Sequence, residues 1–325
     1  MQVLVTGATG FTGGHLARGL ASRGDRVRAL VRRGPAAPLA AAGIEIVQGD
    51  LCDPASLRRA CEGVEIVYNI AALYREAGLP ERAYFDVNAA AVGSLVTAAA
   101  SAGARRVVHC STVGVHGDVE HPPADEDAPL RPGDVYQRSK VEGERIARQA
   151  AVADRIEVVI ARPSGIYGPG DRRLLKLFRG VAHRRFVLLG DGRIYYHLTY
   201  IDDLVEGFLL CGTVAAAAGR TYILAGPDTP TLGEVLEAVA DAAGVPASPW
   251  RLPVWPVWMA GAACEVVCRP FGIAPPLYRR RVDFFTKSRA FSIARARLEL
   301  GYAPRVHLKD GVRRTLTWYR GERWV

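Results

Sequence analysis

Tyr136 and Lys140 are the residues of this sequence whose types and spacing best suit proton transfer. If residues 136 to 140 are helical, the i,i+4 spacing places the phenol and the ammonium side by side on one face. The positive charge would then lower the pKa of the phenol, which could exchange a proton with a carbinol or ketone oxygen near neutral pH. The alternative is a surface pair on an ordinary helix, because the pattern is short and both residues are common.

A glycine-rich turn near the N-terminus supplies a context for this pair. An apolar, strand-like run, Val3 to Thr6, leads into three glycines at a spacing of three, and a helical pattern follows. Glycines let the backbone turn sharply and approach a pyrophosphate, which then rests on the N–H groups at the start of the helix. A purely structural turn is the alternative, but the position between a strand and a helix favours a dinucleotide site. The expected cofactor contacts in this turn are Gly7, Thr9, Gly10, Phe11, Thr12 and Gly13.

The end of the second expected strand bears on the choice of nicotinamide coenzyme. A carboxylate at this point would accept the adenosine ribose hydroxyls, but the sequence has Val31 followed by Arg32 and Arg33. We therefore expect NADP(H) to be favoured, with NAD(H) possible. Further along, Asp50-Leu51 suits an adenine contact, and the small side chains of Ala71-Ala72 would lie beside the cofactor.

Short β-branched runs and Ala-rich helical stretches alternate over residues 1 to about 165, which is typical of a parallel sheet covered on both faces. The expected strands are 3–6, 27–31, 44–48, 66–70, 106–110 and 158–162. Helices are expected near 13–23, 55–62, 84–103 and 135–152. This order predicts an α/β fold with a doubly wound parallel sheet, whose ligands lie beyond the carboxyl ends of the strands. Asp134 can cap the helix that carries Tyr136, with Gln137 completing a capping box.

The second half of the sequence, residues 166–325, predicts mainly a smaller α/β substrate-binding subdomain, with some segments returning to the sheet. Helices are expected at 174–183, 203–211 and 231–243, and short strands at 186–190, 198–200 and 221–224. The run 252–277 is apolar and rich in tryptophan and proline, too broken to span a bilayer. We interpret it as a cover over an apolar substrate cleft; ordinary packing or a dimer interface is the alternative.

Composition narrows the class of protein. The 325-residue sequence is 49% hydrophobic and carries a net charge of +9, but its arginines accompany no nucleic-acid-binding motif. Its six cysteines form no CxxC pair and lie near no histidine cluster, so neither a disulfide framework nor a metal site is expected. No uninterrupted apolar stretch reaches membrane-spanning length, and Met1 leads directly into a strand, so a cytoplasmic protein is expected.

Together these patterns resemble an extended short-chain dehydrogenase/reductase, a superfamily that includes nucleotide-sugar epimerases and dehydratases, hydroxysteroid dehydrogenases and dihydroflavonol reductases. The resemblance covers nearly the whole length. It rests on Thr6 to Gly13, Asp50-Leu51, Ala71-Ala72, Asn88, Ser111-Thr112, Tyr136 with Lys140, Arg162-Pro163, Tyr167 to Asp171, Asp202-Asp203, and Leu300 to Pro304.

The resemblance implies a role for each matching residue. Tyr136 would be the general acid/base, Lys140 would hold the nicotinamide ribose and lower the pKa of the tyrosine, and Thr112 with Ser111 would hydrogen-bond the substrate oxygen. Asn88 and Pro163 would contribute to the cofactor site. Dimers are common in this superfamily through the helices near 84–103 and 135–152, so a homodimer is expected.

Departures from the superfamily's patterns bear on the substrate. Dehydratases follow the active-site threonine with an acidic pair, but here Val113 and Gly114 follow Thr112. Sugar-nucleotide epimerases place an asparagine and an arginine where this sequence has Gly165 and Tyr196, which removes two pyrophosphate ligands. Arg193 and the run 279–281 are alternative sources of positive charge. The expected substrate contacts are Tyr74, Val113, Gly165, Arg193 and Tyr196.

Three functions follow as hypotheses. The leading one is an NAD(P)-dependent oxidoreductase that interconverts a secondary alcohol and a ketone on an apolar ring compound, such as a hydroxysteroid, a sterol or a flavonol-like molecule. The alternative enzyme is a nucleotide-sugar 4-epimerase or 4-ketoreductase. A non-catalytic NADP-sensing regulator on the same fold is the third, but such proteins commonly lose the Tyr-xxx-Lys pair, which is present here.

Overall fold

Seven parallel strands form the central sheet of the computed structural model, which describes residues 1–34, 36–76, 78–247, 250–268 and 279–325, without the side chains of 279–281. The strand order is β10-β6-β5-β4-β1-β2-β3, so the chain winds outward from β1 in both directions. The strands are β1 (Gln2–Thr6), β2 (Arg26–Val31), β3 (Glu45–Gln48), β4 (Ile66–Asn69), β5 (Arg106–Cys110), β6 (Glu157–Pro163) and β10 (Thr221–Leu224). The doubly wound fold expected from the sequence is confirmed.

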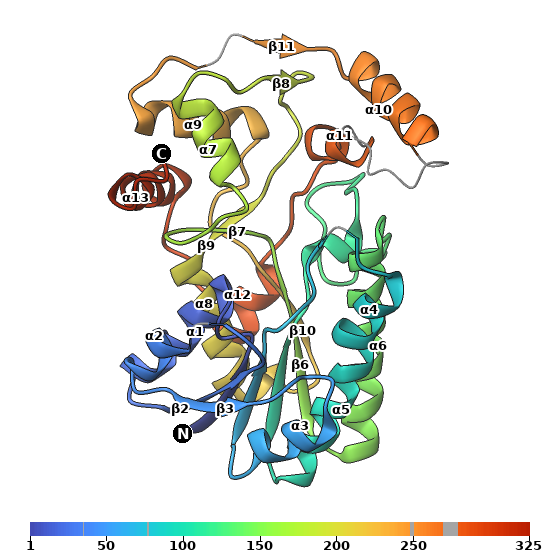
Figure 1. The fold of residues 1–325 in the computed structure, drawn as a ribbon, viewed down its shortest axis with the longest axis vertical. Coiled ribbons are helices and arrows are strands. Elements are labelled where there is room, and N and C mark those ends of the chain that lie inside the picture. The colour runs from blue at the N-terminus through green and yellow to red at the C-terminus, as the bar shows by residue number, and fades with distance from the viewer. Residues whose placement is uncertain (35, 77, 248–249, 269–278) are drawn as a thin grey trace.

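Helices cover both faces of this sheet, as Figure 1 shows. One face carries α1 (Phe11–Ser22), α8 (Ile201–Thr213) and α12 (Ala294–Leu300). The other carries α3 (Pro54–Cys61), α5 (Ala91–Ser101) and α6 (Val135–Asp154). Alternation along β1 explains both layers, because Val3 and Val5 join the apolar cluster of the α1 face and Leu4 joins that of the α5 face.

The helix expected near 84–103 is three consecutive helical segments. It begins with α4 (Glu81–Phe85), continues through the π-helical turn η1 (Asp86–Ala90) and ends as α5. By length and composition the run Glu81–Ser101 could cross a membrane, but half of it is buried inside the fold. Since α5 packs against α3 and α6, the apolar residues of this run have a packing role.

Above the carboxyl ends of the strands lies a second layer made by the later part of the chain (Figure 1). Its helices are α7 (Leu175–Ala182), α9 (Leu232–Ala243), α10 (Val254–Cys268), α11 (Arg279–Thr286) and α13 (Leu308–Gly321). Its strands pair in twos, β7 (Gly165–Tyr167) with β9 (Leu198–Tyr200) and β8 (Leu188–Leu189) with β11 (Arg251–Leu252). The remaining short elements are α2 (Ala37–Ala40), η2 (Val113–His116) and η3 (Ala215–Ala217).

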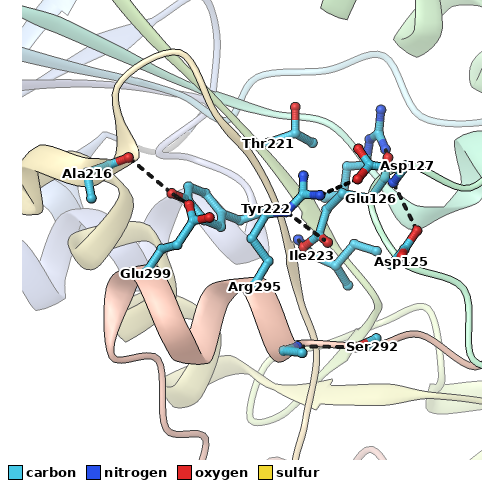
Figure 2. A network of polar contacts seen from close by, with 12 residues as sticks. Asp125, Glu126, Asp127, Ala216, Thr221, Tyr222, Ile223, Ser292, Arg295 and Glu299 are labelled. Carbon is cyan, nitrogen blue, oxygen red and sulfur yellow. Dashed lines mark hydrogen bonds and ion pairs between the residues drawn. The ribbon is translucent and has the colours of Figure 1, made fainter.

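The edge strand β10 and helix α12 return from this layer to the central sheet and are fixed there by polar contacts, which Figure 2 shows. Glu126 Oε1 accepts the backbone N–H of Ile223 at 2.8 Å, and its other oxygen lies 3.6 Å from Arg295 Nε. The hydroxyl of Tyr222 donates to Glu299 at 2.7 Å. These bonds join the loop after β5 to β10 and α12, so this edge of the sheet is held together by distant parts of the chain.

Candidate functional site

A cleft of about 650 Å³ runs along the carboxyl ends of the strands, between the sheet and the upper layer. It is lined by the glycine turn, by the loops after β2, β3 and β4, by the start of α6, and by α11 and the segment that follows it. The sequence-predicted residues that line it are Gly7, Thr9, Gly10, Phe11, Thr12, Gly13, Arg32, Arg33, Asp50, Leu51, Ala71, Ala72, Tyr74, Ser111, Thr112, Val113, Tyr136, Lys140, Pro163, Gly165 and Tyr196. Only Asn88 and Arg193 of the predicted site residues lie outside this lining.

The glycine turn is built for close approach of backbone to backbone. Gly7 has φ +70°, and a Cβ there would lie 2.8 Å from the Cα and N of Ala71. A Cβ on Gly13 would lie 2.3 Å from the carbonyl oxygen of Gly7. Helix α1 begins directly after Gly10, which has no side chain to cap it. The N–H groups at this helix start are therefore available to an anion such as a pyrophosphate.

Polar side chains hold the strand ends beside this turn. The hydroxyl of Thr6 donates to Asn69 Oδ1 at 2.8 Å and accepts the N–H of Ala71 at 3.1 Å. The amide nitrogen of Asn69 lies 3.0 Å from His109 Nδ1. Since all these side chains are buried, β1, β4 and β5 end in a fixed register under the cleft.

The residues expected to determine coenzyme preference lie at the end of β2, as the sequence predicts, and Arg32 and Arg33 line the cleft there. Val31 is buried at the end of β2, whereas the side chain of Arg32 is 65% exposed and lies 3.8 Å from Asp50. This loose, exposed ion pair contributes little to stability. The guanidinium group is free to turn toward a phosphate at this end of the cleft.

Tyr136 and Lys140 lie on one face of α6, with 9% and 1% of their surfaces exposed. Asp134 caps this helix by accepting the N–H of Gln137 at 2.8 Å, as predicted. The capping box is wrong in one detail, because the side chain of Gln137 accepts the N–H of Gly133, at 2.6 Å, rather than that of Asp134. The helix therefore starts at a doubly anchored turn.

The expected effect of Lys140 on Tyr136 is not what the structure gives. Burial raises the pKa of Tyr136, and the charges that oppose this rise are those of Arg75 and Arg173. Burial likewise lowers the pKa of Lys140. The reason is that both side chains lose contact with water on burial. Water would stabilise the phenolate form of Tyr136 and the ammonium form of Lys140, and without it both charged forms are disfavoured.

Lys140 has a buried ammonium group with no hydrogen-bond partner among the described residues. One turn further along α6, Glu144 is fully buried and binds Arg162 through two bonds of 2.9 and 2.7 Å. This pair fastens α6 to β6. Glu144 thus has a partner in the sheet, whereas the ammonium of Lys140 has none among the described residues, which is expected of a group that binds a ligand.

Thr112 and Ser111 follow β5 and face the same part of the cleft. The oxygen of Thr112 accepts the N–H of Gly114 at 3.0 Å, which leaves the hydroxyl proton for another acceptor. Ser111 is buried at 2% exposure and lies close enough to Glu144 for its hydroxyl to help lower the pKa of that carboxyl group. Of the two hydroxyls, that of Thr112 is the better placed to hold a substrate oxygen.

Tyr74 and Arg75, in the loop after β4, lie beside the ring of Tyr136. The ring of Tyr74 meets the ring of Tyr136 edge to face, at 4.9 Å between centroids. The guanidinium of Arg75 lies 5.4 Å from the first centroid and 5.9 Å from the second, and it pairs with Asp134 at 2.9 Å. Arg75 was not predicted; no motif marks it, because it lies in a loop that reaches the site only in three dimensions.

The side of the cleft opposite the glycine turn is largely aromatic. Tyr196 packs against Phe284 at 5.1 Å, and Phe291 lines the same region. A Cβ on Gly165 would lie 2.8 Å from the side chain of Leu198, so a larger residue there would disturb β9. Gly165 and Tyr196, the positions where the sequence departs from the sugar-epimerase pattern, therefore do face the cleft.

Charged groups that the sequence did not single out also line this side. Arg173 binds Asp171 at 2.8 Å, and Lys287 binds Asp283 at 2.9 Å. Arg289 lies beside Tyr196. Arg173 comes from the loop before α7, whereas Asp283 lies on α11 and Lys287 and Arg289 follow that helix, more than 100 residues later. Only the folded chain reveals that these two regions share a site.

Three of the predicted site regions do not line the cleft in this structure, and the roles assigned to them stay predictions. Asn88 is fully buried in the π-helical turn, where it bonds the backbone of Leu73 and the hydroxyl of Ser139; it holds the loop after β4 against α6 and does not line the cofactor cleft. Arg193 has an 88% exposed side chain outside the cleft. The described part of the run 252–277 is mostly the exposed helix α10, which lies above α11 and outside the cleft (Figure 1).

The side chains of the run 279–281 and residues 269–278 lie outside the described residues, so the predicted charge compensation by these arginines is not described. The side of the cleft opposite the glycine turn, called the substrate side below, is covered by α11. This helix contributes Asp283 and Phe284 to the lining, and Lys287 follows just after it. The predicted cover, 252–277, includes α10, whereas the described residues that line the cleft belong to the next helix, α11.

The residues present fit a nicotinamide dinucleotide. The turn at Gly7 leaves no room for a side chain, the start of α1 is uncapped, and the ammonium of Lys140 is buried without a protein partner. Pyrophosphate oxygens suit the first two features, and ribose hydroxyls suit the third. Tyr136 and Thr112 line the same cleft.

Comparison with known proteins agrees with this geometry. The model of the NAD-dependent epimerase/dehydratase family matches residues 3–225. The chain is 30% identical to 2-alkyl-3-oxoalkanoate reductase of Stenotrophomonas maltophilia, covering 97% of this chain and 98% of that protein. It is 32% identical to sterol demethylase protein B of Methylococcus capsulatus, covering 98% of each. A dTDP-glucose 4,6-dehydratase from Streptomyces venezuelae, solved with NAD bound, superposes with a TM-score of 0.79 at 27% identity, over 99% of this chain and 98% of that one.

The glycine turn, the Tyr136–Lys140 pair and these matches agree on one assignment. The family model covers well over half of the chain, and the relatives above are similar over almost their full length. The chain belongs to the NAD-dependent epimerase/dehydratase family and is an extended short-chain dehydrogenase/reductase, an enzyme that uses a nicotinamide cofactor.

Proposed function

We propose that this enzyme interconverts a secondary alcohol and a ketone on a largely apolar ring substrate of the hydroxysteroid, sterol or flavonol-like kind. The observation that carries the proposal is the combination of Tyr136 and Thr112 with a substrate side walled by Tyr196, Phe284 and Phe291. Aromatic walls favour binding of flat apolar molecules. The similarity to sterol demethylase protein B and to a 3β-hydroxysteroid dehydrogenase/Δ5→4-isomerase of Mycobacterium tuberculosis supports it.

The roles of the chain's residues follow from their positions. In the direction of reduction, Tyr136 donates its proton to the substrate oxygen while the hydroxyl of Thr112 holds that oxygen; in oxidation, Tyr136 accepts the proton. Lys140 holds the nicotinamide ribose, and the positive charges of Arg75 and Arg173 favour the phenolate form that exists between these steps. A bound nicotinamide supplies or accepts the hydride. Tyr136 and Lys140 themselves are buried, so water contributes little to the interactions at these two groups.

Thermal stability of the cofactor-loaded protein tests the substrate class. Sterol or flavonoid ketones are expected to raise the melting temperature, because a ligand that binds only the folded state stabilises it. UDP-sugars and GDP-sugars serve as the comparison set. A rise of several degrees with a nucleoside diphosphate sugar, and none with the ketones, would reverse the assignment.

A nucleotide-sugar 4-epimerase or 4-ketoreductase is the second candidate. The cations Arg173, Lys287 and Arg289 line the substrate side and favour it, because they could approach a diphosphate. The similarity to the dTDP-glucose 4,6-dehydratase also supports it. Against it, two of these cations already bind carboxylates of the chain, so their charge is largely compensated.

We propose NADP(H) as the favoured coenzyme. The support is the apolar Val31 at the end of β2, followed by the exposed Arg32. The test is the ratio of kcat/KM for NADPH to that for NADH in the wild type and in Arg32→Asp. The ratio is expected to fall about tenfold or more, since a hydrogen bond to a charged group contributes roughly 1.5–3 kcal/mol. An unchanged ratio would mean that the guanidinium does not meet the 2′-phosphate.

We also propose a cytoplasmic homodimer that associates through α5 and α6, with residues 1–165 as the dinucleotide-binding domain and 166–325 mainly as the substrate-binding subdomain. Val152 on α6 is 82% exposed, which suits an interface. Light scattering after size-exclusion chromatography is expected to give a dimer for the wild type and a monomer for Val152→Asp. A monomeric wild type would contradict the interface.

A further inference from the structure

Four of the described cationic side chains line the substrate side of the cleft, and three of them form ion pairs with carboxylates of the chain itself. Arg75 pairs with Asp134, Arg173 with Asp171 and Lys287 with Asp283, each at 2.9 Å or less. Among the described residues Arg289 has no carboxylate within 4.0 Å. Its one side-chain bond is a long one, 3.5 Å, to the backbone oxygen of Asp283.

The backbone fixes Arg289 in this position. Its N–H donates to the carbonyl of Tyr195 at 2.9 Å, and its carbonyl accepts the N–H of His197 at 2.9 Å. Arg289 therefore runs parallel to Tyr196, the position at which the sugar-epimerase pattern has an arginine. The chain places a guanidinium beside this point from a different segment of the sequence.

The surroundings of this guanidinium are unfavourable for an isolated charge. Burial lowers the pKa of Arg289, and the positive charge of Arg75 acts in the same direction, whereas the negative charges of Asp283 and Asp118 offset this only in part. Tyr196, Phe284 and Phe291 line the same part of the cleft, and neither carboxylate lies within 4.0 Å of the guanidinium. A partly buried cation without a counter-ion costs stability, and the cost is recovered when an anion binds.

We propose that Arg289 binds a carboxylate carried by the substrate, so that the substrate class is an apolar alcohol or ketone that is also an acid. This inference rests on the proposed function for the chemistry at Tyr136. A guanidinium fork matches one carboxylate with two parallel hydrogen bonds. Among the described residues of this side, Arg289 is the one cation without an ion-pair partner, which suits a single negative charge better than a diphosphate.

Two matched substrate pairs test the proposal. The first is a 3-hydroxysteroid acid and its methyl ester, and the second is a long-chain 3-hydroxy fatty acid and its methyl ester. Each is oxidised with NADP⁺ or NAD⁺, and binding of each to the protein is measured separately by calorimetry. Variants Arg289→Gln and Arg289→Lys are compared with Arg193→Gln, which removes an exposed arginine outside the cleft. UDP-glucose is a fifth ligand.

For the pair that fits the cleft, the wild type is expected to bind the acid ten- to a hundredfold more tightly than the ester. Arg289→Gln should abolish that difference without weakening the ester, Arg289→Lys should restore part of it, and Arg193→Gln should leave it intact. Equal affinity for acid and ester in the wild type, or equal losses for both in Arg289→Gln, would overturn the proposal. Binding of UDP-glucose that depends on Arg289 would overturn the carboxylate assignment.

The same data separate this inference from the proposed function. If no alcohol of either pair is oxidised, the alcohol/ketone activity fails, but calorimetry still decides whether Arg289 distinguishes acid from ester. If the esters are oxidised as well as the acids and with equal KM, the activity stands and the role of Arg289 fails.

Discussion

The two sides of the cleft are built in different ways. The cofactor side is made by short stretches that directly follow the strands, such as Gly7 to Gly13 after β1 and Ala71-Ala72 after β4. The substrate side is made by residues from distant parts of the chain, such as Tyr74, Arg173, Tyr196 and Arg289. The first follows from local backbone requirements, whereas the second depends on how the upper layer packs.

Charge distribution differs in the same way. On the cofactor side the buried cation is Lys140, which has no hydrogen-bond partner among the described residues. On the substrate side the cations are held by Asp134, Asp171 and Asp283, with Arg289 as the exception. Among the described residues, the cofactor side thus offers a ligand the buried Lys140 together with the exposed Arg32 and Arg33, and the substrate side offers Arg289. The difference suggests that the rest of the substrate side is tuned for shape rather than charge.

Replacing Tyr136 by Phe removes the proposed general acid/base between the cofactor side and the substrate side, and we expect this variant to show the largest loss of activity. Loss of general acid/base catalysis should lower kcat about 10²–10⁴-fold, while coenzyme binding changes little. Steady-state kinetics and calorimetry measure the two quantities. Tyr74→Phe is the matched control, since its ring contact with Tyr136 is retained. Unchanged turnover in Tyr136→Phe would exclude the catalytic role and favour the NADP-sensing alternative.

Glu144→Gln tests the scaffold under the cofactor side. Removing the charge leaves Arg162 buried without its counter-ion, which should lower the free energy of unfolding by about 3–5 kcal/mol. Chemical denaturation at neutral pH measures this loss.

The pH dependence of the same variant has a defined sign. Burial raises the pKa of Glu144, but its bonds to Arg162 and the charge of Arg162 lower this pKa by a larger amount, so the net shift is downward. Its stabilising contribution is therefore present above the ordinary value of 4.5 and is lost as the pH falls through the lower, folded-state pKa. The difference between the wild type and Glu144→Gln should shrink in that acidic range. A difference that grows with acidity would contradict the assignment.

Gly7→Ala sharpens the claim that the cofactor side is fixed by backbone contact. Gly24 is the control, because it also has a positive φ, +85°, but a Cβ there would meet nothing within 4 Å. Both variants should lose about 1–2 kcal/mol of stability from the left-handed backbone. Gly7→Ala should lose about 1–3 kcal/mol more from contact with Ala71, and should also bind coenzyme less tightly. Equal losses in thermal or chemical unfolding would show that the contact is not limiting.

How far the sequence predicts this molecule follows the same division. Strand ends, the glycine turn and the Asp134 cap are local features, and the structure has them where expected. Asn88 lies outside the cleft lining because its π-helical turn directs it into the interior, which a periodic pattern does not reveal. Arg75, Arg173 and Arg289 were missed because each reaches the site through loop packing, for which the sequence carries no spacing.

The most direct test of the account is the affinity of NADPH for the wild type and for Lys140→Met, measured by calorimetry without substrate. Since the ammonium of Lys140 lies buried with no bond to a described residue, its removal should weaken coenzyme binding about tenfold or more. The same substitution should leave the cofactor-free protein as stable as the wild type or more stable, because burial lowers the pKa of Lys140 and the charge costs free energy. Lys287→Met, on the substrate side, should bind NADPH normally. Equal NADPH affinity in Lys140→Met and the wild type would contradict the account.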